Sequence, residues 1–135
     1  MGKPEVILVD THVVIWLAFE QERLSKKART AIGDARQNGK GLAISDITLL
    51  ELVTLANKSR LRLAISLETF LREVEARFII LPISAGACIQ ILGLPAAYPQ
   101  DPADRIIGAT ALAEGLTLIT ADREIRQSRA IPTIW

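Results

Sequence analysis

Four carboxylates stand where an ordinary soluble domain has little need of them. Asp10 directly follows the apolar run VILV, and Asp122 follows LTLIT after one intervening residue. Glu51 lies within ITLLELVTLA, a stretch that would be apolar around nearly the whole of a helix and therefore buried. Asp104 shares the small, apolar stripe of its own helix. A buried carboxylate without a partner is costly, so these residues require a compensating charge.

Carboxylates that converge on one place repel one another and need a hard divalent cation, usually Mg²⁺ or Mn²⁺. Such a cluster supports hydrolysis at phosphorus, because one metal activates water and a second, ~4 Å away, stabilises the leaving oxygen. The candidate catalytic residues and metal ligands are Asp10, Glu51, Asp104 and Asp122.

Each of these acids, taken alone, also has a structural explanation. Asp10 and Asp122 can each cap the helix that follows. Glu51 can form a buried salt bridge with an arginine. The stretch Asp101–Asp104, with a proline at the first helical position, resembles a capping box made with Asp instead of Glu. We favour the cap for Asp101, with a water-mediated metal contact as its alternative, whereas for Asp104 the cap and the metal site stay open.

Short apolar strands that alternate with helices must position these acids. The alternation predicts an α/β fold with a central, mainly parallel sheet of about five strands. In such sheets, sites form outside the carboxyl ends of the strands, which is where Asp10 and Asp122 would arrive. Strands are expected at 6–9, 41–45, 78–83, 116–120 and 132–134, and helices at 11–19, 25–37, 46–61, 66–77, 84–95 and 102–115.

The composition fits a single soluble domain over residues 1–135. Half of the chain is apolar, mean hydropathy is +0.29, and the net charge of +1 leaves room only for a local basic groove. The one cysteine, Cys88, is expected to be a small core residue, so no disulfide framework exists. Neither a signal-peptide core nor an apolar run of the ~20 residues that span a bilayer is present. We expect a cytoplasmic protein with no membrane association.

Several polar residues lie close to the four acids along the chain. Thr11 and Ser45 follow or end predicted strands, and Thr120 precedes Asp122 by two positions. Thr11 and Ser45 could each hydrogen-bond to bound water or substrate or could cap a helix, and Thr120 could support the site. His12 is the only histidine, which rules out Ser–His or Cys–His catalysis beyond this one residue. We expect it to pack or hydrogen-bond beside the first acid rather than act as a base.

The order of the four acids resembles that of the PIN-domain ribonucleases, most closely the VapC-type toxins of toxin–antitoxin pairs. LVDTHVVIWLA resembles the family's opening strand and first acid, Asp10, and ISDITLLELVTLANKSRLRL resembles its second block, with Ser45 and Glu51. DPADRIIGATALAEGLTLITAD, the most specific signal, resembles the block that carries the third and fourth acids. The ending IPTIW is similar to that of a subgroup that opens with DTH. The resemblance covers almost the whole chain.

The resemblance implies a three-layer α/β/α sandwich, dependence on Mg²⁺ or Mn²⁺, and endonucleolytic cleavage of RNA, with tRNA or rRNA as the target. All four acids would be catalytic and metal-binding, Glu51 directly or through water. The resemblance also implies a VapB-like antitoxin encoded beside the chain, a homodimer, and contact with operator DNA through the antitoxin alone.

Arg105 and Arg123 flank the acids and could meet RNA phosphates, neutralise the acidic cluster or simply be solvated. The segment KSRLRL, 58–63, could line a nucleic-acid groove or end a charged helix. Trp16 and Trp135 are expected to fill core or interface volume, with base stacking as the less favoured alternative. The candidate RNA contacts are Lys58, Arg60, Arg105 and Arg123.

Other functions fit the sequence less well. A PIN-like module that binds RNA or a partner without cleaving would not need all four acids. A phosphatase with an aspartyl nucleophile would need a second Asp at position 12, where His12 stands. A phosphoacceptor receiver domain would need an acidic pair near the first strand, and a P-loop NTPase would need G-x-x-x-x-G-K-[ST]; neither pattern is present.

Overall fold

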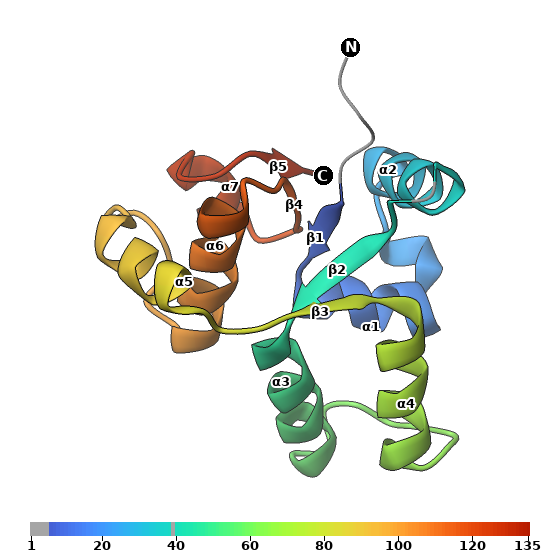
Figure 1. The fold of residues 1–135 in the computed structure, drawn as a ribbon. Helices are drawn as coiled ribbons and strands as arrows, with labels where there is room; N and C mark the ends of the chain where they lie inside the picture. Colours follow the sequence, from blue (N-terminus) through green and yellow to red (C-terminus); the bar gives the residue numbers. More distant parts are fainter. Residues whose placement is uncertain (1–5, 39) are drawn as a thin grey trace.

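The fold is built on one parallel sheet, seen in a computed structural model that describes residues 6–38 and 40–135. In these residues the strand order is β3-β2-β1-β4-β5, and every neighbouring pair is parallel. All strands therefore end at the same edge (Figure 1). The strands are β1 (Ile7–Val9), β2 (Leu42–Ser45), β3 (Ile79–Leu81), β4 (Leu118–Ile119) and β5 (Thr133–Ile134).

Helices cover both faces of the sheet, which confirms the predicted α/β/α sandwich (Figure 1). One face carries α1 (Thr11–Phe19), α2 (Lys26–Gln37) and α4 (Leu67–Arg77), together with one buried side of α3 (Asp46–Asn57). The other face carries α6 (Pro102–Glu114) and α7 (Arg123–Ser128), and α5 (Ala85–Gln90) packs against α6. Two short 3-10 turns, η1 (Gln21–Arg23) and η2 (Ile91–Gly93), follow α1 and α5.

The strands are buried on both faces, so their side chains divide between two cores. Leu8 and Leu118 point into the core beneath α6, whereas Val9 and Ile119 point into the core beneath α1, α2 and α4. This alternation follows from the period of two residues along a strand. It explains why the central strand is a continuous apolar run rather than an alternating one.

Helix α3 differs from the sequence prediction in two ways. It ends at Asn57 rather than near residue 61, because Ser59 adopts a left-handed conformation (φ 57°) and the Arg60 amide turns back to the Leu55 carbonyl at 2.9 Å. The segment 58–63 is therefore a turn and loop. The helix is also not buried all round, since Leu50 is 60% exposed and only Thr48 and Leu52 are fully buried on it.

Cys88 is exposed, so its prediction as a core residue is wrong. Helix α5 buries only Ala87 against the rest of the fold, which leaves the neighbouring cysteine in solvent. Among the described residues, no helix combines the length and apolar character needed to cross a membrane.

Candidate functional site

The sheet edge brings three of the predicted site residues together. Asp10 follows the central strand β1, Ser45 ends β2 on one side of it, and Asp122 follows β4 on the other side. The chain places β2 and β3 on one side of β1 and then β4 and β5 on its other side. The strand order therefore reverses at β1. Such a reversal opens a crevice at the carboxyl ends of parallel strands.

Asp10 is the most firmly held carboxylate of the site. It is 6% exposed, and its two oxygens accept hydrogen bonds from the Thr11 amide at 2.9 Å and from the Thr120 hydroxyl at 2.7 Å. Burial raises the pKa of Asp10 above its ordinary value, and the charge of Asp122 adds to the rise. The two hydrogen bonds and the nearby His12 act in the opposite direction.

Thr120 also connects Asp10 to the fourth acid. Its oxygen accepts a hydrogen bond from the Asp122 amide at 3.1 Å while its hydroxyl donates to Asp10. Asp122 caps α7, because its Oδ1 accepts from the Ile125 amide at 3.0 Å. The helix-cap explanation of Asp122 is therefore correct, and the cap fixes this carboxylate beside Asp10.

Glu51 is held by two threonines rather than by an arginine. The Thr11 hydroxyl donates to Glu51 Oε1 at 2.5 Å, and Thr11 Oγ1 lies 3.0 Å from Thr48 Oγ1. Burial raises the pKa of Glu51, and the charges of Asp10 and Asp101 raise it further. Within the described residues the ion pairs are Arg23–Glu20 and Arg77–Glu73, so the salt bridge considered for Glu51 is not formed there.

Thr48 was missed by the sequence analysis. It is fully buried and lies one turn before Glu51 on α3. Its hydroxyl, donating to Thr11, leaves the Thr11 hydroxyl proton for Glu51. The signal was present in the sequence, because polar residues three apart in an otherwise apolar helix lie on the same face.

Asp104 lies in the first turn of α6, and Asp101 caps that helix. Asp101 Oδ2 accepts a hydrogen bond from the Asp104 amide at 3.1 Å, as the capping prediction requires. Burial raises the pKa of Asp104 to about 7, and the charges of four other carboxylates contribute to the rise. Asp104 is therefore within electrostatic reach of all of them. They are Asp10, Asp101, Asp122 and Glu51.

Tyr98 is a second residue that the sequence analysis missed, and it holds the backbone of Asp104. The buried Tyr98 hydroxyl donates to the Asp104 carbonyl at 2.6 Å. Its ring lies against Gly108, where a Cβ atom would come within 2.6 Å of Tyr98 Cζ. Burial raises the pKa of Tyr98, as do the charges of Asp104 and Asp10. The small residue in the α6 stripe is thus explained by the close approach of this ring.

The remaining predicted residues cap a helix, bind backbone carbonyls or are exposed. Ser45 is fully buried and caps α3 by accepting from the Ile47 amide at 3.3 Å. Arg105 donates to the Pro99 and Ile91 carbonyls, both at 3.4 Å, so its guanidinium ties α6 to η2. The other three basic candidates are exposed, one on α7 and two beyond the end of α3. They are Arg123, Lys58 and Arg60.

The donor set suits a hard cation, although the side chains do not yet converge on one. Among the described residues, no group of three His, Cys, Asp or Glu side chains is placed to hold a metal ion as it stands. The fit rests on chemistry: the ligands are carboxylate oxygens, and burial and mutual repulsion raise the pKa of three of them. A bound cation would relieve this repulsion. The four acids therefore stay the predicted metal ligands.

The raised pKa of Asp104 predicts how the stability of the metal-free protein depends on pH. Its pKa is about 7 in the folded state and 3.8 in the reference state, so the folded protein retains a proton that the unfolded chain releases. This contribution to stability is complete below about pH 4 and is lost as pH rises through about 7. At about pH 8 in EDTA, Asp104→Asn should raise the free energy of unfolding by about 1–2 kcal/mol, less than the full shift implies because solvent screens the carboxylate.

Urea denaturation of both proteins between about pH 4 and 8 measures this difference. Asp34→Asn is the matched control, because Asp34 is exposed on α2. An Asp104→Asn variant whose stability follows wild type at every pH would contradict the electrostatic description of the cluster.

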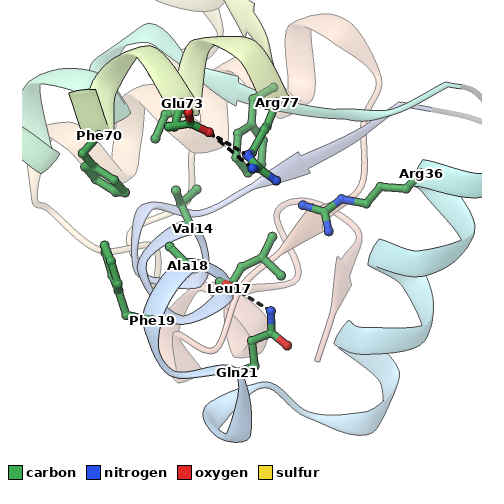
Figure 2. A pocket seen from close by; sticks show the side chains of 11 residues that line it. Val14, Leu17, Ala18, Phe19, Gln21, Arg36, Phe70, Glu73 and Arg77 are labelled. Atoms are coloured by element: carbon green, nitrogen blue, oxygen red, sulfur yellow. Dashed lines mark hydrogen bonds and ion pairs between the residues drawn. The ribbon is translucent and has the colours of Figure 1, made fainter. Parts of the chain in front are cut away.

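A groove separate from the acidic site lies between α1, α2 and α4. Figure 2 shows its apolar floor and the charged side chains at its rim. Its volume is about 320 Å³, and Phe19, 44% exposed, stands at one end with its ring centroid 5.3 Å from that of Phe70. We call it the helix groove. Its floor consists of Val14, Leu17, Ala18, Phe70, Val74 and Phe78, and its rim of Gln21, Arg36, Glu73 and Arg77.

Comparison with known proteins gives consistent results. The PIN domain family profile matches residues 7–130. Ribonuclease VapC22 of Mycobacterium tuberculosis is 37% identical over 131 residues, which are 96% of this chain and 98% of that protein.

Solved toxin–antitoxin structures share the fold. DNA-bound VapBC from Salmonella typhimurium aligns with a TM-score of 0.67 and 25% identity over 96% of each chain. VapBC2 from Rickettsia felis, bound to a DNA fragment from its promoter, aligns with a TM-score of 0.70 over 95% of this chain and 96% of that one. The latter pair is only 17% identical and shows the fold alone.

Proposed function

Because the chain belongs to the PIN-domain family and is of the VapC type, we propose that it is a metal-dependent endoribonuclease, the toxin of a type II toxin–antitoxin pair. It would hydrolyse RNA phosphodiester bonds, with tRNA or rRNA as the target. The observation that carries the proposal is the environment of Asp104, where burial, together with the charges of four other carboxylates, raises the pKa to about 7. That crowding has little structural purpose without a cation.

The chain's own residues would fix the geometry of this reaction. Asp10, Glu51, Asp104 and Asp122 would hold the Mg²⁺ or Mn²⁺, which supplies an activated water molecule and stabilises the leaving oxygen. Thr120 and the Thr11 amide hold Asp10, and the Thr11 hydroxyl holds Glu51. Each threonine thus orients a carboxylate before substrate arrives, which lowers the cost of reaching a reactive arrangement.

Mapping RNA ends after induced expression tests the proposal. Expression of the wild-type chain should produce new RNA ends at a small number of positions in tRNA or rRNA, and Asp10→Ala should produce none while staying folded. Identical end maps for the two proteins would contradict it. RNA binding without cleavage in the presence of Mg²⁺ would favour the alternative function, a PIN-like binding module.

We further propose a VapB-like antitoxin as the partner, bound in the helix groove. The solved VapBC complexes, two of them with DNA, support a partner of this kind. The groove supplies an apolar floor, and its rim carries Arg36 beside an Arg77 that pairs with Glu73 at 3.3 Å, which suits an amphipathic segment with an acidic residue at its edge (Figure 2). Operator DNA would be reached through the antitoxin alone. The toxin would act in the cytoplasm as a homodimer, which light scattering can test.

Ala18→Asp should weaken antitoxin binding and leave RNA cleavage unchanged. The substitution adds a carboxylate to apolar surface that the partner would cover, which costs about 2–3 kcal/mol and lowers affinity by about 30- to 150-fold. Calorimetry with the protein encoded by the neighbouring gene measures the affinity. Ala76→Asp is the control, since Ala76 is exposed on α4 and does not line the groove. Equal affinities for the two variants would place the partner elsewhere.

A further inference from the structure

A second cavity lies directly beside the acidic site. Its volume is about 490 Å³, which is within the usual range for a small-molecule pocket. His12 lines it and stands two residues after Asp10, in the first turn of α1. Thr11, between Asp10 and His12 in the chain, donates its amide to Asp10 and its hydroxyl to Glu51, so the cavity adjoins both acids through consecutive residues of α1. We call the cavity the arginine pocket. Its polar lining includes His12, Glu20, Arg23, Ser59, Arg60 and Arg62.

The arginine pocket is positively charged, in contrast to the acids next to it. It is lined by three arginines and one carboxylate, that of Glu20. Glu20 already pairs with Arg23 at 3.1 Å. Neither Arg60 nor Arg62 forms an ion pair within the part of the chain that the structure describes. Two cations are therefore available to an anionic ligand at this place.

The backbone holds these two arginines at the pocket. The left-handed residue Ser59 turns the chain at the end of α3, and the Arg60 amide donates to the Leu55 carbonyl at 2.9 Å. Leu61, between the arginines, is buried in the core with 8% exposure. Arg60 and Arg62 stand on either side of this anchored residue, and all three line the pocket.

Flat side chains form the opposite wall. The Arg23 guanidinium lies over the Trp16 ring, 4.6 Å from its centroid. Trp16 is braced by Trp135, with ring centroids 5.7 Å apart. The exposed His12 ring is tilted at 54° to Trp16. A guanidinium stacked on an aromatic ring offers its outer plane to a nucleobase, and so does an imidazole.

We propose that the arginine pocket binds an unpaired nucleotide next to the phosphate that is cleaved. Arg60 and Arg62 contact its phosphates, and its base stacks on Arg23 or His12. The base must be free of its partner to enter this pocket. This inference rests on the proposed ribonuclease activity and adds the subsite that holds the nucleotide.

Binding of RNA in EDTA, where no cleavage is expected, tests the proposal. The probes are a short unpaired oligoribonucleotide and a fully paired duplex of the same sequence, followed by fluorescence anisotropy. Wild type should prefer the unpaired RNA. The double variant Arg60→Ala/Arg62→Ala should bind it at least about tenfold more weakly, and its salt slope should fall by about 1 to 1.5 because two phosphate contacts are lost. His12→Ala should weaken binding and leave the salt slope unchanged.

The control is Lys27→Ala/Arg72→Ala, which removes two positive charges from exposed positions on α2 and α4. If both double variants lose the same affinity, or wild type binds duplex equally well, the pocket is not a nucleotide site. Loss of antitoxin affinity in Arg60→Ala/Arg62→Ala, with RNA affinity kept, would likewise overturn the proposal in favour of a protein partner.

Different outcomes would overturn the proposed ribonuclease function and the proposed nucleotide pocket. Cleavage of the unpaired RNA by wild type in Mg²⁺, with no effect of the arginine substitutions, would overturn the pocket and keep the ribonuclease. A wild-type protein that binds the RNA through the pocket and does not cleave it in Mg²⁺ would keep the pocket and overturn the ribonuclease.

Discussion

Asp104→Asn should lower the rate of RNA cleavage by at least about a thousandfold while the protein stays folded. The substitution removes one negative charge from the centre of the cluster, where four other carboxylates act on Asp104. An amide is a poor ligand for Mg²⁺ compared with a carboxylate. The Asp104 amide and carbonyl keep their hydrogen bonds to Asp101 and Tyr98, so the start of α6 should be unchanged.

Single-turnover cleavage of an unpaired RNA in Mg²⁺ measures this effect without a contribution from product release. Glu114→Gln is the matched control, because Glu114 is exposed at the other end of the same helix. The control should cleave at the wild-type rate. An Asp104→Asn variant within tenfold of wild type would remove Asp104 from the catalytic residues.

Gly108→Ala should destabilise the protein by about 1–3 kcal/mol and slow cleavage as well. The new methyl group would overlap the Tyr98 hydroxyl and come within 2.6 Å of Tyr98 Cζ. Tyr98 is buried, so the ring can move only at the expense of its packing and of its hydrogen bond to the Asp104 carbonyl. This cost exceeds the gain of about 1 kcal/mol that alanine brings to a helix. Because Tyr98 supports Asp104, displacement of the ring should also lower the cleavage rate.

Gly33→Ala makes the comparison specific. Gly33 is also inside a helix, and no heavy atom lies within 4 Å of its Cβ position. Gly33→Ala should therefore leave the stability unchanged or raise it, and the cleavage rate should stay the same. Urea denaturation and single-turnover cleavage of the two variants give both comparisons. If both substitutions stabilise the protein equally, the contact between Gly108 and Tyr98 is not as described.

Local sequence patterns were sufficient to predict the fold and the position of the acids. Ser25, Ser66 and Asp101 cap the helices that were expected to start there. Asp10 and Asp122 follow strands that neighbour each other in a parallel sheet, so their common edge could be inferred before the strand order was known.

Contacts between distant segments could not be predicted in the same way. The hydrogen bond between Thr11 and Thr48 joins residues 37 positions apart, and only the packing of α1 on α3 brings them together. The exposure of Leu50 was missed because an apolar pattern does not reveal whether solvent or protein covers it. Arg105 was a candidate RNA contact with a solvated role as its alternative, and sequence alone did not show that its guanidinium donates to two backbone carbonyls.

The central claim is that Asp10, Glu51, Asp104 and Asp122 together hold a divalent metal on which RNA cleavage depends. Its most direct test is the cleavage rate of an unpaired RNA by protein stripped of metal with EDTA, measured as Mg²⁺ is titrated back. We expect no cleavage before Mg²⁺ is added and a rate that rises to saturation afterwards, with Asp10→Asn inactive throughout. Cleavage at the full rate in EDTA would contradict the claim.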